Sequence, residues 1–251
     1  MASHRFMTPL ILIPARMAAT RLPGKPLADI EGVSMIVRVL RQAEAAGVGP
    51  VAVAAGDREI VAAVEAAGGR AVLTDSALPS GSDRIWAALG ALDPEGRHDV
   101  VINLQGDMPF VEPAMVAACA GLLTAQPDAD IATLVAPEAG PADRTNADVV
   151  KAVLAMQPEG HSGKALYFTR STLYGDGPIW RHIGLYGYRR AALAAFVAAP
   201  PSPLERREGL EQLRAMELGL SIWAAVAETA PISVDSPADL ERARHHARMP
   251  A

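Results

Sequence analysis

Short apolar runs alternate along the chain with stretches whose apolar residues recur every three or four positions. The runs typical of buried strands are LILIPA (10–15), PVAVAAG (50–56), RAVLTD (70–75), DVVINLQGD (99–107) and ADIATLVA (129–136). The segments with helical spacing between them are 34–47, 58–69, 82–92 and 112–125. A strand followed by a helix, repeated in this way, predicts an α/β fold with a mostly parallel, doubly wound sheet and helices on both faces.

The regular alternation of strand-like and helical segments ends at about residue 140. Strand-like runs at 149–156, 165–169, 183–190 and 221–228 follow one another with less helix between them. Two later segments begin with a capping box, in which Ser202 and Glu205 open one helix and Ser236 and Asp239 open the last one. We interpret residues 1–251 as a single domain that contains a smaller α+β lobe at about 141–220, with a role in oligomerisation.

Composition narrows the function classes. The 251 residues carry a formal net charge of −5, which argues against a general nucleic-acid binder. The single cysteine, Cys119, lies in an apolar helical segment and is expected to be a buried core residue. No apolar run approaches the ~20 residues of a membrane span, so we expect a cytoplasmic protein without a membrane partner.

The loop after the first strand concentrates positive charge. Arg16, Arg21 and Lys25 lie among three prolines and Gly24, which restrict the backbone path. The loop is not a P-loop, because position 19 is Ala and Lys25 is followed by Pro26. A solvated turn would also explain three cations, but ligands of such sheets bind at the carboxyl ends of the strands, where this loop begins. The residues therefore favour a triphosphate site.

Two acidic residues point to a metal ion. Asp107 follows the strand that ends at Leu104, and Asp235 precedes the last helix, where Ser236 already supplies the cap. A carboxylate beside a phosphate site repels it unless a cation lies between them. Mg²⁺ prefers carboxylate, phosphate and water oxygens, so it is the expected ion.

Several motifs in order resemble one known family. They are IPARMAATRLPGKPL, SGSDR, NLQGDMP, VVKAV, ALYFTR, RHIGLYGYRR, SPLERREGLEQLR and VDSPADLERAR, and they cover about Leu10 to Arg244. Together they are similar to the 3-deoxy-manno-octulosonate (Kdo) cytidylyltransferases. The resemblance implies a nucleotidyltransferase-type α/β sheet with a smaller dimerising lobe. It also implies that CTP and Kdo give CMP-Kdo and pyrophosphate with Mg²⁺, for lipopolysaccharide synthesis in the cytoplasm by a homodimer.

The resemblance also implies roles for particular residues. Those expected to be catalytic are Arg16, Lys25 and Asp107. Those expected to bind the nucleotide are Pro14, Ala15, Arg16, Lys25, Ser80, Gly81, Arg84 and Gln105. Those expected to contact the sugar acid are Arg170, His182, Tyr186, Glu211 and Gln212. Asp107 and Asp235 would be the metal ligands.

The chain departs from the family pattern at two positions. Gly56 occupies the place of an Asp in the pattern Ala-Thr-Asp, and Met108 occupies the place of a Glu. The loop YGDGPIW is also short. Because of these departures, another carboxylated sugar, such as an 8-amino-Kdo or a sialic-type acid, is an alternative acceptor of CMP.

Other classes are also open. A nucleotidyltransferase for a neutral sugar phosphate would use the same cations, and a non-catalytic CTP sensor would bind without turnover. An NAD(P)-dependent oxidoreductase would need GxGxxG after the first strand, and the sequence from Pro14 to Gly24 lacks it.

Overall fold

The computed structural model describes residues 8–18 and 21–249, and the chain divides into two compact units. One unit comprises residues 1–117 and 231–251, and the other comprises residues 118–230. The long helix α4 (Pro113–Ala125) runs from the first unit into the second. Each unit is described by itself below.

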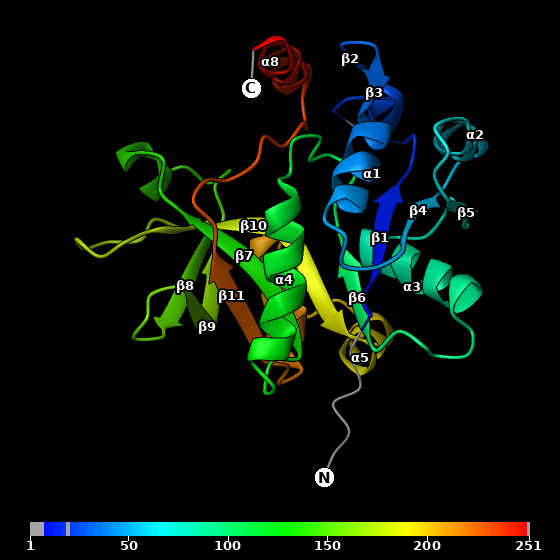
Figure 1. The fold of residues 1–251 in the computed structure, drawn as a ribbon. Coiled ribbons are helices and arrows are strands. Elements are labelled where there is room, and N and C mark those ends of the chain that lie inside the picture. The colour runs from blue at the N-terminus through cyan, green and yellow to red at the C-terminus, as the bar shows by residue number, and fades with distance from the viewer. Residues whose placement is uncertain (1–7, 19–20, 250–251) are drawn as a thin grey trace. The chain divides into compact units, whose positions relative to one another are not determined.

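Four parallel strands form the centre of the first unit, in the order β5-β4-β1-β6 (Figure 1). They are β1 (Leu10–Ala15), β4 (Val51–Ala55), β5 (Ala71–Leu73) and β6 (Val100–Asn103). All six residues of β1 are buried. A strand covered on both faces has no solvent-facing positions, which explains why LILIPA is a continuous apolar run.

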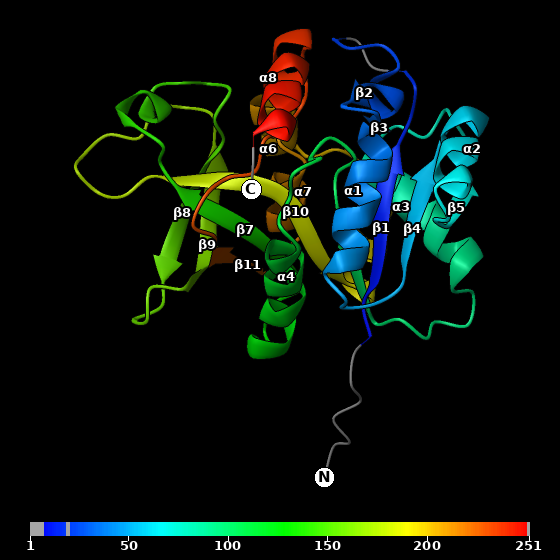
Figure 2. The same cartoon turned by 45° about the horizontal axis from the view of Figure 1, so that its top comes forward.

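Helices cover both faces of these strands, as predicted. Helices α1 (Met35–Ala45) and α2 (Arg58–Ala66) lie on one face and α3 (Gly81–Leu92) lies on the other (Figure 2). The predicted apolar positions of α1 are all buried: Met35, Ile36, Val39, Leu40 and Ala43. This arrangement brings the N-terminus of α3 to the same edge of the sheet as the carboxyl ends of β1 and β6.

A small hairpin that the sequence did not predict follows the cationic loop. Its strands are β2 (Asp29–Ile30) and β3 (Val33–Ser34), and its turn has positive φ angles at Glu31 and Gly32. The last helix, α8 (Pro237–Arg248), packs against it. Their shared apolar cluster consists of Ile30, Met35, Val234, Leu240 and Ala243. Burial of these side chains fixes the C-terminal segment beside the loop.

The second unit contains a mixed sheet of five strands in the order β10-β7-β11-β9-β8. They are β7 (Ile131–Pro137), β8 (Lys151–Met156), β9 (Ser162–Thr169), β10 (Trp180–Arg189) and β11 (Ile222–Val226). β11 runs parallel to β7, and the other pairings in this unit are antiparallel. The loss of strand–helix alternation in the sequence thus corresponds to a change from parallel to mainly antiparallel strand pairing.

Three helices complete the second unit: α5 (Arg190–Ala198), α6 (Pro203–Glu208) and α7 (Gln212–Glu217). The sequence analysis did not predict α5. The predicted capping box of Ser202 and Glu205 is present, but the helix it opens ends at Glu208. Gly209 follows with φ of 65°, a left-handed conformation that glycine adopts without strain, and a separate helix then begins.

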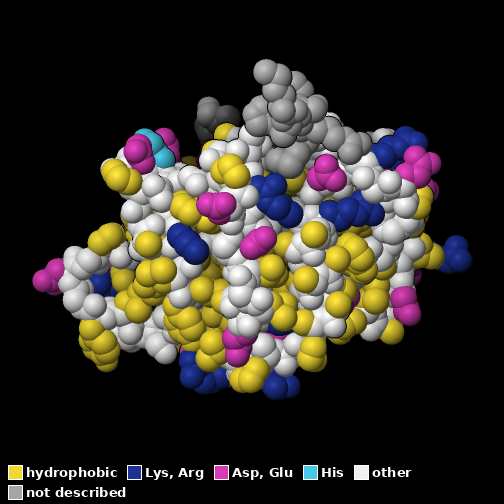
Figure 3. Space-filling model, turned by 90° about the horizontal axis from the view of Figure 1, so that it is seen from below, with side chains coloured by type: hydrophobic (Ala, Val, Ile, Leu, Met, Phe, Trp, Pro, Cys, Tyr) yellow, Lys and Arg dark blue, Asp and Glu magenta, His cyan; other side chains and the backbone are white. Residues whose placement is uncertain are grey.

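Other expectations from composition can be compared with the structure. Cys119 is buried, and burial raises the pKa of its thiol to about 12, as expected for an unreactive core cysteine. Within residues 8–18 and 21–249, no helix is both long and apolar enough to cross a bilayer. On the face seen in Figure 3, charged side chains of both signs are spread among hydrophobic ones.

Candidate active site

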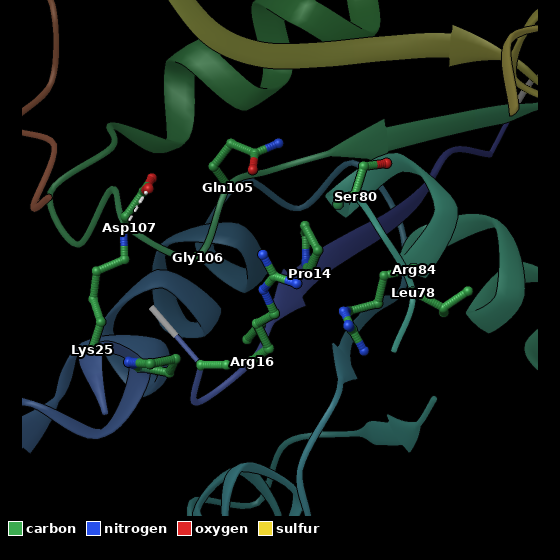
Figure 4. Close-up of a pocket in the computed structure, with 13 residues that line it drawn as sticks. Pro14, Arg16, Lys25, Leu78, Ser80, Arg84, Gln105, Gly106 and Asp107 are labelled. Carbon is green, nitrogen blue, oxygen red and sulfur yellow. Dashed lines mark hydrogen bonds and ion pairs between the residues drawn. The ribbon is translucent and has the colours of Figure 1, made fainter. Parts of the chain in front are cut away.

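A cavity of about 310 Å³ lies in the first unit, where β1, β6 and the N-terminus of α3 meet. Its size is within the range of small-molecule sites. The lining residues are Pro14, Ala15, Arg16, Ala18, Lys25, Pro26, Leu78, Ser80, Gly81, Arg84, Gln105, Gly106 and Asp107. Every residue predicted to bind the nucleotide is among them. In Figure 4, Lys25 and Asp107 lie on one side, Arg84 and Leu78 on the other, and Arg16 between them.

Glycine allows the strand ends to approach closely. A Cβ atom on Gly106 would lie 2.9 Å from the backbone oxygen of Pro14, closer than real Cβ contacts come. A Cβ on Gly81 would lie 3.3 Å from Cγ of Pro14. The backbone after β6 and the first turn of α3 can therefore line the cavity only because these positions carry no side chain.

Two arginines make one side of the cavity positive. Arg84 is buried, and its guanidinium donates to Oγ1 of Thr74 at 2.6 Å and to the backbone oxygen of Asp75 at 3.0 Å. Burial lowers the Arg84 pKa, and the charge of Arg16 lowers it further. Neighbouring cations of this kind favour the binding of an anion between them.

Lys25, Asp107 and Asp235 form an ionic cluster on the other side. Nζ of Lys25 donates to Oδ2 of Asp107 at 2.9 Å and to Oδ1 of Asp235 at 3.1 Å. Arg21, on the rim, also pairs with Asp235 at 3.3 Å. The structure therefore brings together the two carboxylates that the sequence analysis had singled out separately.

The pKa values in the cluster reflect burial and pairing. Burial raises the pKa of Asp107 above its usual range, although the ammonium of Lys25 pulls it down. Burial lowers the pKa of Lys25, but Asp107 and Asp235 together outweigh this effect and the net shift is upward. Lys25 is thus held in its charged form.

Contacts along the C-terminal segment bring Asp235 to this position. The backbone N–H of Val234 donates to the backbone oxygen of Asp107 at 2.9 Å, and the Val234 side chain is buried in the cluster under α8. Ser236 and Asp239 form the capping box of α8. Because they supply the cap, the carboxylate of Asp235 can face Lys25.

The donor set of this cluster fits a hard divalent cation. Two carboxylates from distant parts of the chain converge on one positive group, the Lys25 ammonium, which shows that a cation is stabilised at this point. Carboxylate oxygens are the protein ligands that Mg²⁺ prefers. Asp107 and Asp235 are therefore suitable residues to hold this ion.

The second unit contains the residues predicted to contact the sugar. His182 and Tyr186 on β10 pair with Val135 and Thr133 on β7 and so lie on one side of the sheet. The strand is irregular between Ile183 and Tyr186, which places Tyr186 opposite Thr133. The rings of His182 and Tyr186 are 5.4 Å apart, and Phe168 packs edge-on against His182 at 5.0 Å. Burial lowers the His182 pKa to about 3, so the ring is neutral near pH 7.

The hydrogen bonds of Thr133 favour one tautomer of that neutral ring. Oγ1 of Thr133 lies 3.0 Å from Nε2 of His182 and within 3.1 Å of the backbone oxygens of Ile183 and Leu185. Carbonyl oxygens only accept, so the single hydroxyl hydrogen points to one of them. The hydroxyl oxygen then accepts from Nε2–H of His182.

The remaining predicted sugar residues lie in two places. Glu211 precedes α7 close enough to Tyr186 for its charge to help raise the tyrosine pKa, which burial raises most. Gln212 is buried, and its Nε2 has no hydrogen-bond partner among the described residues. Arg170 lies in a separate cavity of this unit, which is lined by Thr145, Ala147, Arg170, Ser171, Thr172, Arg207 and Glu208.

Comparison with known proteins identifies the family. The cytidylyltransferase family model matches residues 10–222. A 3-deoxy-manno-octulosonate cytidylyltransferase of Parvibaculum lavamentivorans is 59% identical over 237 residues, covering 94% of this chain and 91% of the relative. One of Rhodospirillum centenum is also 59% identical, over 94% of this chain and 92% of the relative. The chain belongs to the 3-deoxy-manno-octulosonate cytidylyltransferase family. It is a nucleotidyltransferase enzyme, and the predicted resemblance is confirmed.

Solved structures agree with membership of the 3-deoxy-manno-octulosonate cytidylyltransferase family. A CMP:2-keto-3-deoxy-manno-octonic acid synthetase complexed with CTP matches with a TM-score of 0.88 and 36% identity, over 95% of this chain and 98% of that chain. A 4-diphosphocytidyl-2C-methyl-D-erythritol synthase from Anaerococcus prevotii, 11% identical, matches with a TM-score of 0.66 over 97% of this chain and all of the other. This more distant likeness concerns the fold alone. The predicted nucleotidyltransferase-type α/β fold is confirmed.

The two departures from the pattern of the 3-deoxy-manno-octulosonate cytidylyltransferases have structural explanations. A Cβ on Gly56 would lie 2.7 Å from Nη1 of Arg84, so the missing side chain leaves room for this guanidinium. Met108 is buried, so this chain uses the position for packing instead of a carboxylate.

Sequence reasoning did not identify the residues that orient the site. Oδ2 of Asp57 accepts from the backbone N–H of Met17 at 2.7 Å and so holds the cationic loop. Oδ1 of Asn103 accepts from Nε2 of Gln105 at 3.0 Å and sets the direction of that amide. Asp57 follows β4 and Asn103 ends β6, but the sequence pattern specifies neither the contact between the two strand ends nor the direction of the Gln105 side chain.

Proposed function

We propose that this enzyme transfers CMP from CTP to Kdo, giving CMP-Kdo and pyrophosphate for lipopolysaccharide synthesis. The observation that carries the proposal is one cavity at the strand ends that contains Arg16, Lys25 and Arg84 together with Asp107. The 59% identity to relatives named for this reaction and the likeness to a synthetase complexed with CTP support it.

The residues of the first unit would bind and orient the nucleotide. Arg16 and Lys25 would hold the triphosphate and stabilise the departing pyrophosphate, because the attraction of a fixed cation for an oxygen becomes stronger as negative charge develops on that oxygen. Pro14, Ala15, Ser80, Gly81, Arg84 and Gln105 would form the rest of the nucleotide site. Asp107 and Asp235 would hold Mg²⁺, which when bound offsets negative charge on the phosphate oxygens.

The reaction needs positioning more than covalent catalysis. A hydroxyl oxygen of the sugar forms a bond to the α-phosphorus, the bond to the β-phosphate oxygen breaks, and the hydroxyl proton is released. His182 and Tyr186 would contact the sugar as neutral groups. Glu211 and the side-chain amide of Gln212 would supply further polar contacts, and Arg170 would attract the sugar carboxylate.

We further propose that residues of about 141–220 form the sugar-binding and dimerising lobe. Tyr174 is 94% exposed and Leu166 is 56% exposed, and exposed large apolar side chains favour a protein contact. Sedimentation of the wild type beside Tyr174→Asp checks this part. A dimer that the substitution dissociates is expected, and a monomeric wild type would contradict it.

The proposed reaction is checked by measuring pyrophosphate release with Mg²⁺. CTP, UTP, ATP and GTP are each paired with Kdo, an 8-amino-Kdo, a sialic acid and a neutral sugar phosphate. Release with CTP and Kdo alone is expected. Release with CTP and another acid would retain the mechanism and change the acceptor. CTP binding without release from any pair would favour a sensor instead.

A further inference from the structure

Lys25 has two possible sets of anionic partners in this protein, and its single charge cannot fully neutralise both at once. Its ammonium is engaged with Asp107 and Asp235, at 2.9 and 3.1 Å. The same side chain lines the cavity in which the nucleotide is proposed to bind. A lysine whose ammonium is directed at these two carboxylates is therefore less available to the triphosphate in the same conformation.

The ammonium occupies the point on which the two carboxylates converge. A divalent ion held by both Asp107 and Asp235 would lie at the carboxylates that the ammonium contacts, and an ammonium a few ångströms away would repel it strongly. Without any cation there, the two carboxylates would repel each other. Lysine is suited to such a position because its charge is compact and its stem is flexible.

The local backbone allows the side chain to move alone. The N–H of Lys25 donates to the oxygen of Leu22 at 3.1 Å, and the N–H of Leu27 donates to the oxygen of Gly24 at 2.9 Å. These bonds hold the short helical turn at Lys25–Leu27. The backbone is thus fixed, while rotation about the side-chain bonds can carry the ammonium from the carboxylates toward the cavity.

We propose that Lys25 acts as a resident counter-ion, which occupies the metal position in the nucleotide-free enzyme and exchanges from the carboxylates to the triphosphate when metal and CTP bind. The proposal rests on the proposed function for the identity of the anion. It makes Lys25 unfavourable for binding of the metal alone and favourable for binding of the nucleotide. An ion pair that only stabilises the loop would not have these opposite effects.

The experiment measures Mn²⁺ binding by the electron paramagnetic resonance signal of the free ion, without nucleotide. Wild type, Lys25→Met, Lys25→Arg and the matched surface control Lys164→Met are compared. Lys25→Met is expected to bind Mn²⁺ about tenfold more tightly, because a nearby positive charge is removed. Lys25→Arg and Lys164→Met are expected to stay within about threefold of the wild type, since the first keeps the charge and the second removes an exposed lysine of β9 in the other unit.

The same proteins are then titrated with CTP in the presence of Mn²⁺. Lys25→Met is expected to bind CTP about tenfold more weakly. The same substitution thus strengthens Mn²⁺ binding and weakens CTP binding. Mn²⁺ binding that is unchanged or weaker in Lys25→Met, or that is absent from every protein, would overturn the exchange. Circular dichroism checks folding, and Lys25→Gln replaces the Met variant should it not fold.

Failure of the exchange can be distinguished from failure of the proposed function. A wild type that releases pyrophosphate from CTP and Kdo, together with unchanged Mn²⁺ affinity in Lys25→Met, would overturn the exchange and retain the transferase. Tighter Mn²⁺ binding in Lys25→Met, with no release from any substrate pair, would retain the exchange and reject the transfer.

Discussion

Each unit contains a cluster of oppositely charged side chains, and the two clusters differ in their burial and in the geometry of their ion pairs. In the second unit, Arg214 donates to both carboxylate oxygens of Glu205, at 2.7 and 2.5 Å, and these side chains are only 8% and 11% exposed. In the first unit, Lys25 contacts two carboxylates through one atom. Its side chain is 17% exposed, and that of Asp235 is 42% exposed.

The difference separates a structural role from a functional one. Glu205 and Arg214 join α6 to α7 through a bidentate ion pair. The guanidinium of Arg214 also lies over the Phe196 ring, 4.4 Å from its centroid. No exchange of partners is possible there without leaving a buried charge. In the Lys25 cluster, Arg21 is a second, exposed cation beside Asp235, and Lys25 and Asp107 line the cavity, so another cation can replace the ammonium at little structural cost.

The largest effect is expected for Asp107→Ala. Turnover should fall about a thousandfold or more, because a metal ligand contributes several kcal/mol to the stabilisation of phosphate charge. The melting temperature should change little, since the raised pKa of Asp107 shows that burial of its charge is unfavourable. Pyrophosphate release and calorimetry measure the two quantities. Near-wild-type activity would remove Asp107 from the metal site, and Glu112→Ala is the control.

The reverse result is expected for Glu205→Ala. Loss of Glu205 leaves the buried charge of Arg214 without this carboxylate, which typically costs about 3–5 kcal/mol of unfolding free energy. The melting temperature should therefore fall by several degrees. Denaturant unfolding measures the change, and Glu228→Ala, in the same unit, controls for loss of an exposed carboxylate. A stability equal to that of the wild type would show that the pair is not structural.

The contribution of Glu205 should depend on pH. Burial raises its pKa, but Arg214 and the Ser202 backbone outweigh burial, so the folded-state pKa lies below the ordinary value of 4.5. A depressed carboxyl pKa stabilises the fold above the unfolded pKa, and this stabilisation is lost as the pH falls through the folded pKa. Unfolding free energies of wild type and Glu205→Gln should thus converge below about pH 4. A gap that widens on acidification would contradict this assignment.

The smallest effect is expected for Arg21→Ala. Its ion pair with Asp235 is solvent-exposed, and such pairs contribute about 0–1 kcal/mol. Turnover within about threefold of the wild type and an almost unchanged melting temperature are expected. A loss comparable to that of Asp107→Ala would mean that the rim arginine, and not only Lys25, balances the carboxylates.

The strongest patterns in the sequence predicted the elements well. LILIPA matches β1 from Leu10 to Ala15, because burial on both faces produces an uninterrupted apolar run. The buried face of α1 follows from its helical spacing. Helix α5 was missed because a short run rich in alanine has no clear period. The break at Gly209 was missed because a capping box marks where a helix begins and not where it ends.

The sequence by itself determined the alternating α/β pattern, the cationic loop after β1 and the family to which the chain belongs. These follow from local periodicity and from motifs whose order can be read directly. Only the tertiary structure decided that Lys25, Asp107 and Asp235 share one point, and that Gly56 makes room for Arg84. The physical reason is that such contacts depend on burial of the apolar cluster around Val234 and on close approach of the strand ends. These join residues that are far apart in the sequence, and Lys25 and Asp235 are separated by 210 positions.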